Sequence, residues 1–115
     1  MSELELHAAF GSVHDDDGAR VVAFAASDDP EDGYVFVQAD ITSPAAPLYL
    51  EVSDEIFGAF DALEAVHFGD GLIALTIRPA MAMRFGAVSR VLVHWDDATD
   101  GGAEAAAALQ AMMAR

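Results

Sequence analysis

The histidines carry the most distinctive chemistry in this sequence, and they stand at His7, His14, His67 and His94. Imidazole and carboxylate groups both bind divalent metals, and His14 is followed by the three carboxylates of Asp15–Asp17. No H-E-x-x-H pattern is present, and a metal site needs several fixed ligands with supporting contacts. We therefore interpret His14 as a turn histidine beside solvated carboxylates, and we assign no metal-binding residue.

Three acidic turns resemble calcium-binding loops at first sight. An EF-hand loop needs oxygen ligands at fixed positions around an invariant glycine. Placing Gly18, Gly33 or Gly101 at that glycine puts Val13, Pro30 or Ala98 where a ligand is required. The acidic segments are therefore interpreted as ordinary solvated turns.

A nucleophile with a neighbouring base cannot be recognised from the sequence patterns. The chain has no cysteine, and none of its serines stands in a G-x-S-x-G nucleophile elbow. No glycine-rich phosphate loop leads from a strand into a helix. Carboxylate pairs are so common on a chain this acidic that no single pair is informative. We expect a protein that is not an enzyme, with no catalytic residues and no cofactor.

The charge of the chain narrows the class of partner. Twenty acidic residues face five basic ones, all arginine, which gives a formal net charge of -15. This negative field argues against nucleic acid, whose phosphates need a basic face, and against anionic membranes. It favours rapid capture of a basic protein by electrostatic steering. The alternative interpretation is that the charge serves only solubility.

The segments between the acidic turns read mostly as strands. Apolar and polar residues alternate in Leu4–Phe10 and in Leu48–Val52, as in half-buried strands. Asp70-Gly71, between two apolar runs, predicts a hairpin. Pro79–Ala87 is either a long hairpin loop or a short helical turn.

The alanine-rich tail Ala103–Arg115 predicts one helix, with Thr99 or Asp100 as its N-cap. With 115 residues, 54% of them hydrophobic, residues 1–115 are expected to form a single domain. The expected fold class is α+β: an antiparallel β-sheet of about six or seven strands with one C-terminal helix packed on a face.

The stretch between two of the expected strands combines apolar side chains with carboxylates. Asp54, Glu55, Ile56 and Phe57 are hypothesised to form part of a binding rim, in which acids flank apolar anchors. The alternative is structural, with the apolar side chains tucked under the sheet edge. We favour the structural interpretation for Phe60 and Leu63.

The succession from Leu48 to Ile77 resembles the immunity protein ten family of bacterial polymorphic toxin systems. The matching positions lie in a strand and the segment after it, in a hairpin, and in an acidic turn before the last helix. They are Tyr49, Glu51, Asp54, Gly58, Phe60, Asp61, Leu63, Glu64, Asp70, Leu72, Asp96 and Asp97. Phe60 stands where the family pattern has tyrosine. The segment Pro79–Ala87 is more apolar than the corresponding segment expected in the family. The resemblance carries over no catalytic residue.

The resemblance implies a cytoplasmic, non-catalytic immunity protein that binds and neutralises a cognate bacterial toxin domain. Toxins of such systems are often nucleases with a basic face, which an acidic inhibitor would cover. The sequence start has no basic n-region, and no apolar run approaches the roughly 18 residues that span a bilayer. The alternatives are an acidic structural or oligomeric module, for which a homodimer is left open, and a small-ligand-binding domain.

Overall fold

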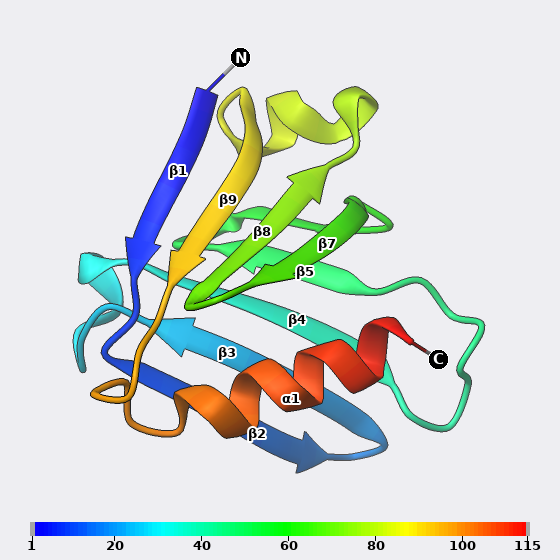
Figure 1. Ribbon diagram of the computed structural model, residues 1–115. Helices are drawn as coiled ribbons and strands as arrows, with labels where there is room; N and C mark the ends of the chain where they lie inside the picture. Colours follow the sequence, from blue (N-terminus) through cyan, green and yellow to red (C-terminus); the bar gives the residue numbers. More distant parts are fainter. Residues whose placement is uncertain (1, 115) are drawn as a thin grey trace.

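The computed structural model describes residues 2–114, and the side chains of Ser2 and Glu55 lie outside that description. Within residues 2–114 the chain forms nine strands, one α-helix and two 3₁₀-helices. The strands divide into a five-stranded and a four-stranded sheet, which pack against each other, and the helix crosses the five-stranded sheet beside the four-stranded one (Figure 1).

The five-stranded sheet is built from consecutive segments, each antiparallel to the next. Its strands are β2 (Phe10–Asp16), β3 (Ala19–Ala25), β4 (Tyr34–Asp40), β5 (Tyr49–Val52) and β6 (Asp54–Phe60). The β2–β3 hairpin turns at Asp17 and Gly18, whose φ angles of 52° and 77° suit a tight hairpin turn. The 3₁₀-helix η1 (Pro30–Asp32) lies between β3 and β4.

The four-stranded sheet has the order β1-β9-β8-β7. Its strands are β1 (Ser2–His7), β7 (Leu63–Gly69), β8 (Leu72–Ile77) and β9 (Val88–His94). The β1–β9 pair is parallel, and the other two pairs are antiparallel. The hairpin predicted at Asp70-Gly71 joins β7 to β8, and Pro79–Ala87 contains the 3₁₀-helix η2 (Pro79–Phe85).

One hydrophobic cluster joins both sheets and the helix α1 (Gly102–Met113). Its members include Val22, Phe24, Val35, Val37 and Leu50 from the five-stranded sheet, Leu6, Ile73, Leu75, Val91 and Val93 from the four-stranded sheet, and Ala105, Leu109 and Met112 from α1. The inner face of the five-stranded sheet is thus covered partly by the other sheet and partly by α1. Its outer face is left without a covering layer among the described residues (Figure 1).

The helix lies unusually close to β2, because one residue of that strand has no side chain. A Cβ atom added at Gly11 would lie 2.9 Å from the Cβ of Ala105 and 2.9 Å from the carbonyl oxygen of Gly101. Real Cβ atoms do not approach neighbours so closely, so the contact between α1 and β2 requires glycine here.

The start of α1 differs from the expectation that Thr99 or Asp100 would cap it. Gly101 is the N-cap residue, with φ of 72°, and it provides no side-chain hydrogen bond. Thr99 is buried instead, and its Oγ1 donates to the carbonyl oxygen of Ala8 at 2.8 Å. The same oxygen accepts a hydrogen bond from the Asp96 amide at 3.0 Å. Thr99 therefore ties the turn before α1 to the end of β1.

The α+β class and the C-terminal helix packed on a sheet are confirmed. The strands are more numerous than expected, and they form two sheets. Leu4–Phe10 is not one strand, because β1 ends at His7 and β2 begins at Phe10, where the chain passes from one sheet to the other. The acidic turn expected around His14 is largely strand, because β2 continues to Asp16 with mostly exposed side chains and so lacks a hydrophobic period.

Candidate functional site

The hypothesised rim residues Asp54, Glu55, Ile56 and Phe57 all lie in β6, the edge strand of the five-stranded sheet. They form part of a strand and not the connecting loop that the sequence suggested. The register between β5 and β6 shifts between Glu51 and Val52, and Ser53 has a φ of 62°. This irregularity turns the chain sharply from β5 into β6.

The structure separates these residues by their exposure. Asp54 is exposed, and Ile56 has 68% of its surface accessible. Phe57 is half-buried against the core. The Glu55 side chain lies outside the described part of the chain. Ile56 is therefore available to a partner, whereas Phe57 contributes to packing.

Phe57 borders a cavity of about 270 Å³ between the two sheets. Ile77, Phe85 and Val91 also border it, and Ser53 is the one polar residue in its lining. A catalytic or specific small-ligand site usually brings several polar groups together in a cavity. The described residues that line this cavity offer no such convergence.

Phe60 contradicts the expectation that it would tuck under the sheet. It is 61% exposed, because it alternates with the buried Ala59 and therefore points to the outer face. Leu63, given the same interpretation, is buried at 7% exposure, and that prediction is confirmed.

Phe60 ends a row of four aromatic rings on the outer face of the five-stranded sheet, which we call the aromatic stripe. The stripe consists of Tyr34, Phe36, Tyr49 and Phe60 and crosses β4, β5 and β6. Neighbouring ring centroids are 6.2, 5.7 and 5.0 Å apart, within the range of favourable aromatic contacts. Tyr49 and Phe60 are direct register partners, whereas Phe36 pairs with Glu51 and lies diagonally from Tyr49.

Glu51 lies within the aromatic stripe and is held by two tyrosines. The Tyr34 hydroxyl donates to Glu51 Oε2 at 2.6 Å, and the Tyr49 hydroxyl donates to Oε1 at 2.7 Å. Burial, followed by the nearby Glu51 carboxylate, raises the pKa of Tyr34 well above its usual range. The tyrosine therefore remains a donor, and the carboxylate is fixed in one orientation.

A shallow groove of about 320 Å³ begins at Glu51, and we call it the acidic groove. It is lined by Pro30, Glu31, Tyr34, Glu51, Ser53 and Asp54. Three of the six lining residues are acidic, and one of them, Asp54, belongs to the hypothesised rim. Carboxylates beside aromatic rings are suited to an arginine or lysine side chain, through ion pairing and cation–π contact.

A second hollow lies at the Phe60 end of the aromatic stripe. It has a volume of about 320 Å³, and Asp17, Asp40 and Phe60 are among its lining residues. The outer face therefore has apolar rings at its centre and carboxylates at both ends. This is the usual arrangement of a protein–protein interface, with an apolar centre and a polar rim.

The His14 corner considered in the sequence is not among the groups of described side chains whose ligand atoms lie close together. His14 lies in β2 and pairs with Val21, while the adjacent Asp15 side chain is bound to Arg20 at 2.8 Å. The hydrogen bond from Arg20 lowers the pKa of Asp15. Successive strand residues point to opposite faces, so the side chains of His14 and Asp15 diverge.

The aromatic stripe and acidic groove include residues that sequence reasoning did not assign to the site. Tyr49 and Glu51 matched the family pattern by type, which was a usable signal. Tyr34 lies 17 residues before Glu51, and the two meet because β4 pairs with β5. No sequence pattern indicated that contact.

Comparison of the chain with protein-family models, with curated proteins and with solved structures gives no match. In residues 2–114, no helix combines the length and the apolar character that crossing a bilayer requires.

Proposed function

We propose that this chain is a non-catalytic immunity protein that binds and neutralises a cognate bacterial toxin domain through the outer face of its five-stranded sheet. The observation that carries the proposal is the tyrosine-held Glu51, placed where the aromatic stripe meets the acidic groove. The family resemblance around Tyr49, Glu51 and Asp54 supports the same part of the chain.

The chemistry of the outer face favours a basic toxin surface. Glu51 is fixed in position before binding, so a partner arginine can pair with it without ordering a flexible side chain. The exposed Phe60 and the half-buried rings beside it supply the apolar contact that hot spots usually need. A nuclease has a basic face for its substrate, and this acidic face would cover it.

A second copy of the chain is a poorer occupant of this face than a basic toxin. Each copy has a net charge of -15, so self-association would bring carboxylates against carboxylates. Juxtaposed like charges oppose association. The alternative of an oligomeric module built on this face is therefore disfavoured.

The proposal is tested by co-expressing the chain with the polymorphic toxin domain encoded beside it, together with a pull-down. We expect the cells to survive and a stable complex to form. Glu51→Gln and Phe60→Ala should each weaken the complex and reduce protection. Glu104→Gln is the matched control, because it removes the same charge from an exposed side chain of α1, on the opposite side of the sheet.

Two results would overturn the proposal. The first is toxicity despite soluble expression, with no complex recovered. The second is an equal loss of binding in Glu51→Gln and Glu104→Gln, which would mean that total charge and not this face sets the affinity. Circular dichroism spectra of all variants establish that each is folded.

A further inference from the structure

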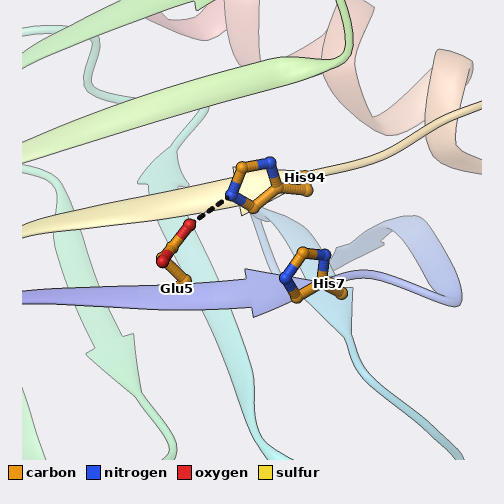
Figure 2. A group of neighbouring side chains, drawn as sticks. All are labelled: Glu5, His7 and His94. Atoms are coloured by element: carbon orange, nitrogen blue, oxygen red, sulfur yellow. Dashed lines mark hydrogen bonds and ion pairs between the residues drawn. The ribbon is translucent and has the colours of Figure 1, made fainter.

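The outer face of the four-stranded sheet gathers two histidines and a glutamate from strands far apart in the sequence. In the parallel β1–β9 pair, His7 is the direct register partner of His94. Glu5 lies two residues before His7, so both side chains share one face of β1. Figure 2 shows the three side chains above the same surface of the sheet.

The ligand atoms of these side chains lie close enough to share one ion. One donor atom from each of Glu5, His7 and His94 lies within 4.8 Å of the other two. His94 Nε2 is 2.8 Å from Glu5 Oε1, and the two imidazole rings stack with centroids 4.6 Å apart. Tetrahedral zinc, with bonds of about 2.0–2.2 Å, places its donor atoms roughly 3.4 Å apart. Small side-chain rotations would bring the three donors to that spacing.

The ligand types select a class of metal. Two imidazoles and one carboxylate suit Zn²⁺ and its neighbours among the transition metals, whereas Ca²⁺ and Mg²⁺ prefer oxygen ligands alone. Three protein ligands leave a coordination position open for water. We propose that Glu5, His7 and His94 bind a divalent transition metal ion of the Zn²⁺ type.

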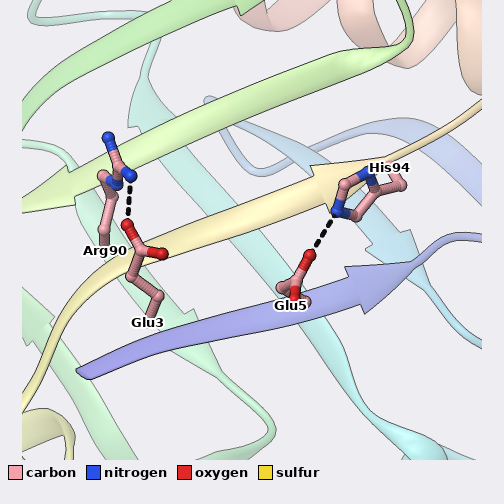
Figure 3. Close-up of polar contacts among 4 residues, drawn as sticks. All are labelled: Glu3, Glu5, Arg90 and His94. Carbon is pink, nitrogen blue, oxygen red and sulfur yellow. Dashed lines mark hydrogen bonds and ion pairs between the residues drawn. The ribbon is translucent and has the colours of Figure 1, made fainter.

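The surroundings of the three residues favour a cation. Glu5 and His7 are exposed and His94 is half-buried, so an ion can reach them from solvent. The nearest arginine on this face, Arg90, forms an ion pair with Glu3 (Figure 3). The partners of His94 and Leu92 on the next strand are Leu72 and Ala74, which carry no charge. The net charge of -15 adds a general attraction for a dication.

Binding would replace a hydrogen bond by two metal–ligand bonds. The 2.8 Å contact between His94 Nε2 and Glu5 Oε1 is a hydrogen bond. When Nε2 of the neutral imidazole becomes a ligand, the ring proton is carried by Nδ1, and the Glu5 carboxylate binds the ion directly. The ion would then cross-link β1 to β9. This inference does not rest on the proposed toxin-binding function, since it concerns the other sheet.

The test is calorimetric titration of chelator-treated protein with Zn²⁺, in buffer that contains excess Mg²⁺ to occupy sites made of carboxylates alone. We expect one tightly bound Zn²⁺ for each chain and an increase in Tm when it is bound. Co²⁺ bound in place of Zn²⁺ should show the visible absorption bands of an ion with nitrogen ligands and a low coordination number. In NMR spectra, the ring signals of His7 and His94 should shift before those of His14 and His67.

Variants decide which residues bind the metal. His7→Gln and His94→Gln should each weaken Zn²⁺ binding by roughly tenfold or more, as loss of a ligand removes more than an outer contact does. His67→Gln is the matched control, because His67 is exposed on the same face of the same sheet.

The absence of Zn²⁺ binding, or its displacement by Mg²⁺, would overturn the inference. So would equal weakening by His67→Gln, or earlier shifts of the His14 and His67 rings. The order in which the histidine ring signals shift is measured in the unsubstituted protein, so it decides the question even if a variant fails to fold.

Discussion

At the scale of single residues, Glu51 and Tyr34 are a mutually dependent pair. The hydroxyl of Tyr34 supplies one of the two hydrogen bonds that orient the carboxylate, and the carboxylate helps to keep that hydroxyl protonated. Such bonds to a charged acceptor are stronger than bonds between neutral groups. The pair therefore links the charge of the acidic groove to the stability of the sheet at high pH.

We predict that the free energy of unfolding falls less steeply with rising alkaline pH in Tyr34→Phe than in the unsubstituted protein. In the unfolded chain Tyr34 loses its proton near about pH 10. Because the folded-state pKa is raised, the contribution of Tyr34 is fully present below that value and is lost as the pH rises toward the folded-state pKa. Denaturant unfolding from pH 8 upward, at steps of about half a unit, measures the slope. Parallel slopes in the two proteins would contradict this account.

At the scale of elements, β6 does two tasks with alternate residues. Phe57 and Ala59 turn inward, and Ile56 and Phe60 remain exposed. One strand thus both closes the edge of the core and presents apolar side chains beside Glu51. Substitutions at neighbouring positions in β6 should therefore have different consequences.

We predict that Phe57→Ala lowers the free energy of unfolding by about 2 kcal/mol or more, because it enlarges the cavity beside Phe85. Ile56→Ala should change it by no more than about 0.5 kcal/mol, since that side chain is exposed. Affinity for the proposed toxin partner should fall in Ile56→Ala. Chemical denaturation and binding titration of both variants give the comparison, and a destabilised Ile56→Ala would refute the division of tasks.

The contact between α1 and β2 leads to a second prediction about elements. Gly11→Ala should destabilise the fold by about 1–3 kcal/mol, because the new methyl group must displace Ala105 or the Gly101 carbonyl. Gly69→Ala is the matched control, since its Cβ would meet its nearest neighbours at 3.7 and 3.9 Å. Thermal unfolding should give a lower Tm for Gly11→Ala than for Gly69→Ala, and the reverse order would contradict the close approach.

Local sequence signals predicted elements whose contacts are also local. Asp70-Gly71 predicted the β7–β8 hairpin, and the alanine-rich tail predicted α1. Long-range pairing had no such signal: the parallel β1–β9 pair depends on the whole chain. The strand β6 was missed because Ser53 interrupts the alternation of residues where β5 turns into it. Asp54 and Ile56 could be proposed from the sequence because they lie close together in one segment. Tyr34 could not, because it meets Glu51 only through the pairing of β4 with β5.

At the scale of the whole molecule, two outer sheet faces carry two kinds of polar chemistry. The five-stranded sheet presents rings and carboxylates, and the four-stranded sheet presents imidazoles beside Glu5. Both lie in the negative field of a chain with a net charge of -15. That field acts on approach to the molecule, while the local groups act after contact.

We predict that salt slows the association of the chain with the toxin domain proposed as its partner. The association rate constant should fall by about tenfold or more as salt rises from low concentration to well above about 0.1 M, where screening acts over about 10 Å. Stopped-flow mixing with a catalytically inactivated toxin domain measures it. Glu51→Gln should act mainly on dissociation. An association rate that does not change with salt would contradict electrostatic steering.

The parallel pairing of β1 with β9 also has a consequence for protein synthesis. The strands β2 to β6 pair with sequence neighbours, so the five-stranded sheet can form while the chain is still being translated. β1 leaves the ribosome well before β9, and α1 follows later still. Until β9 and α1 have been synthesised, they cannot cover the inner side of the newly formed five-stranded sheet, which includes Val37 and Leu50. Translation of the last third of the chain is therefore the interval in which the nascent protein most needs a chaperone.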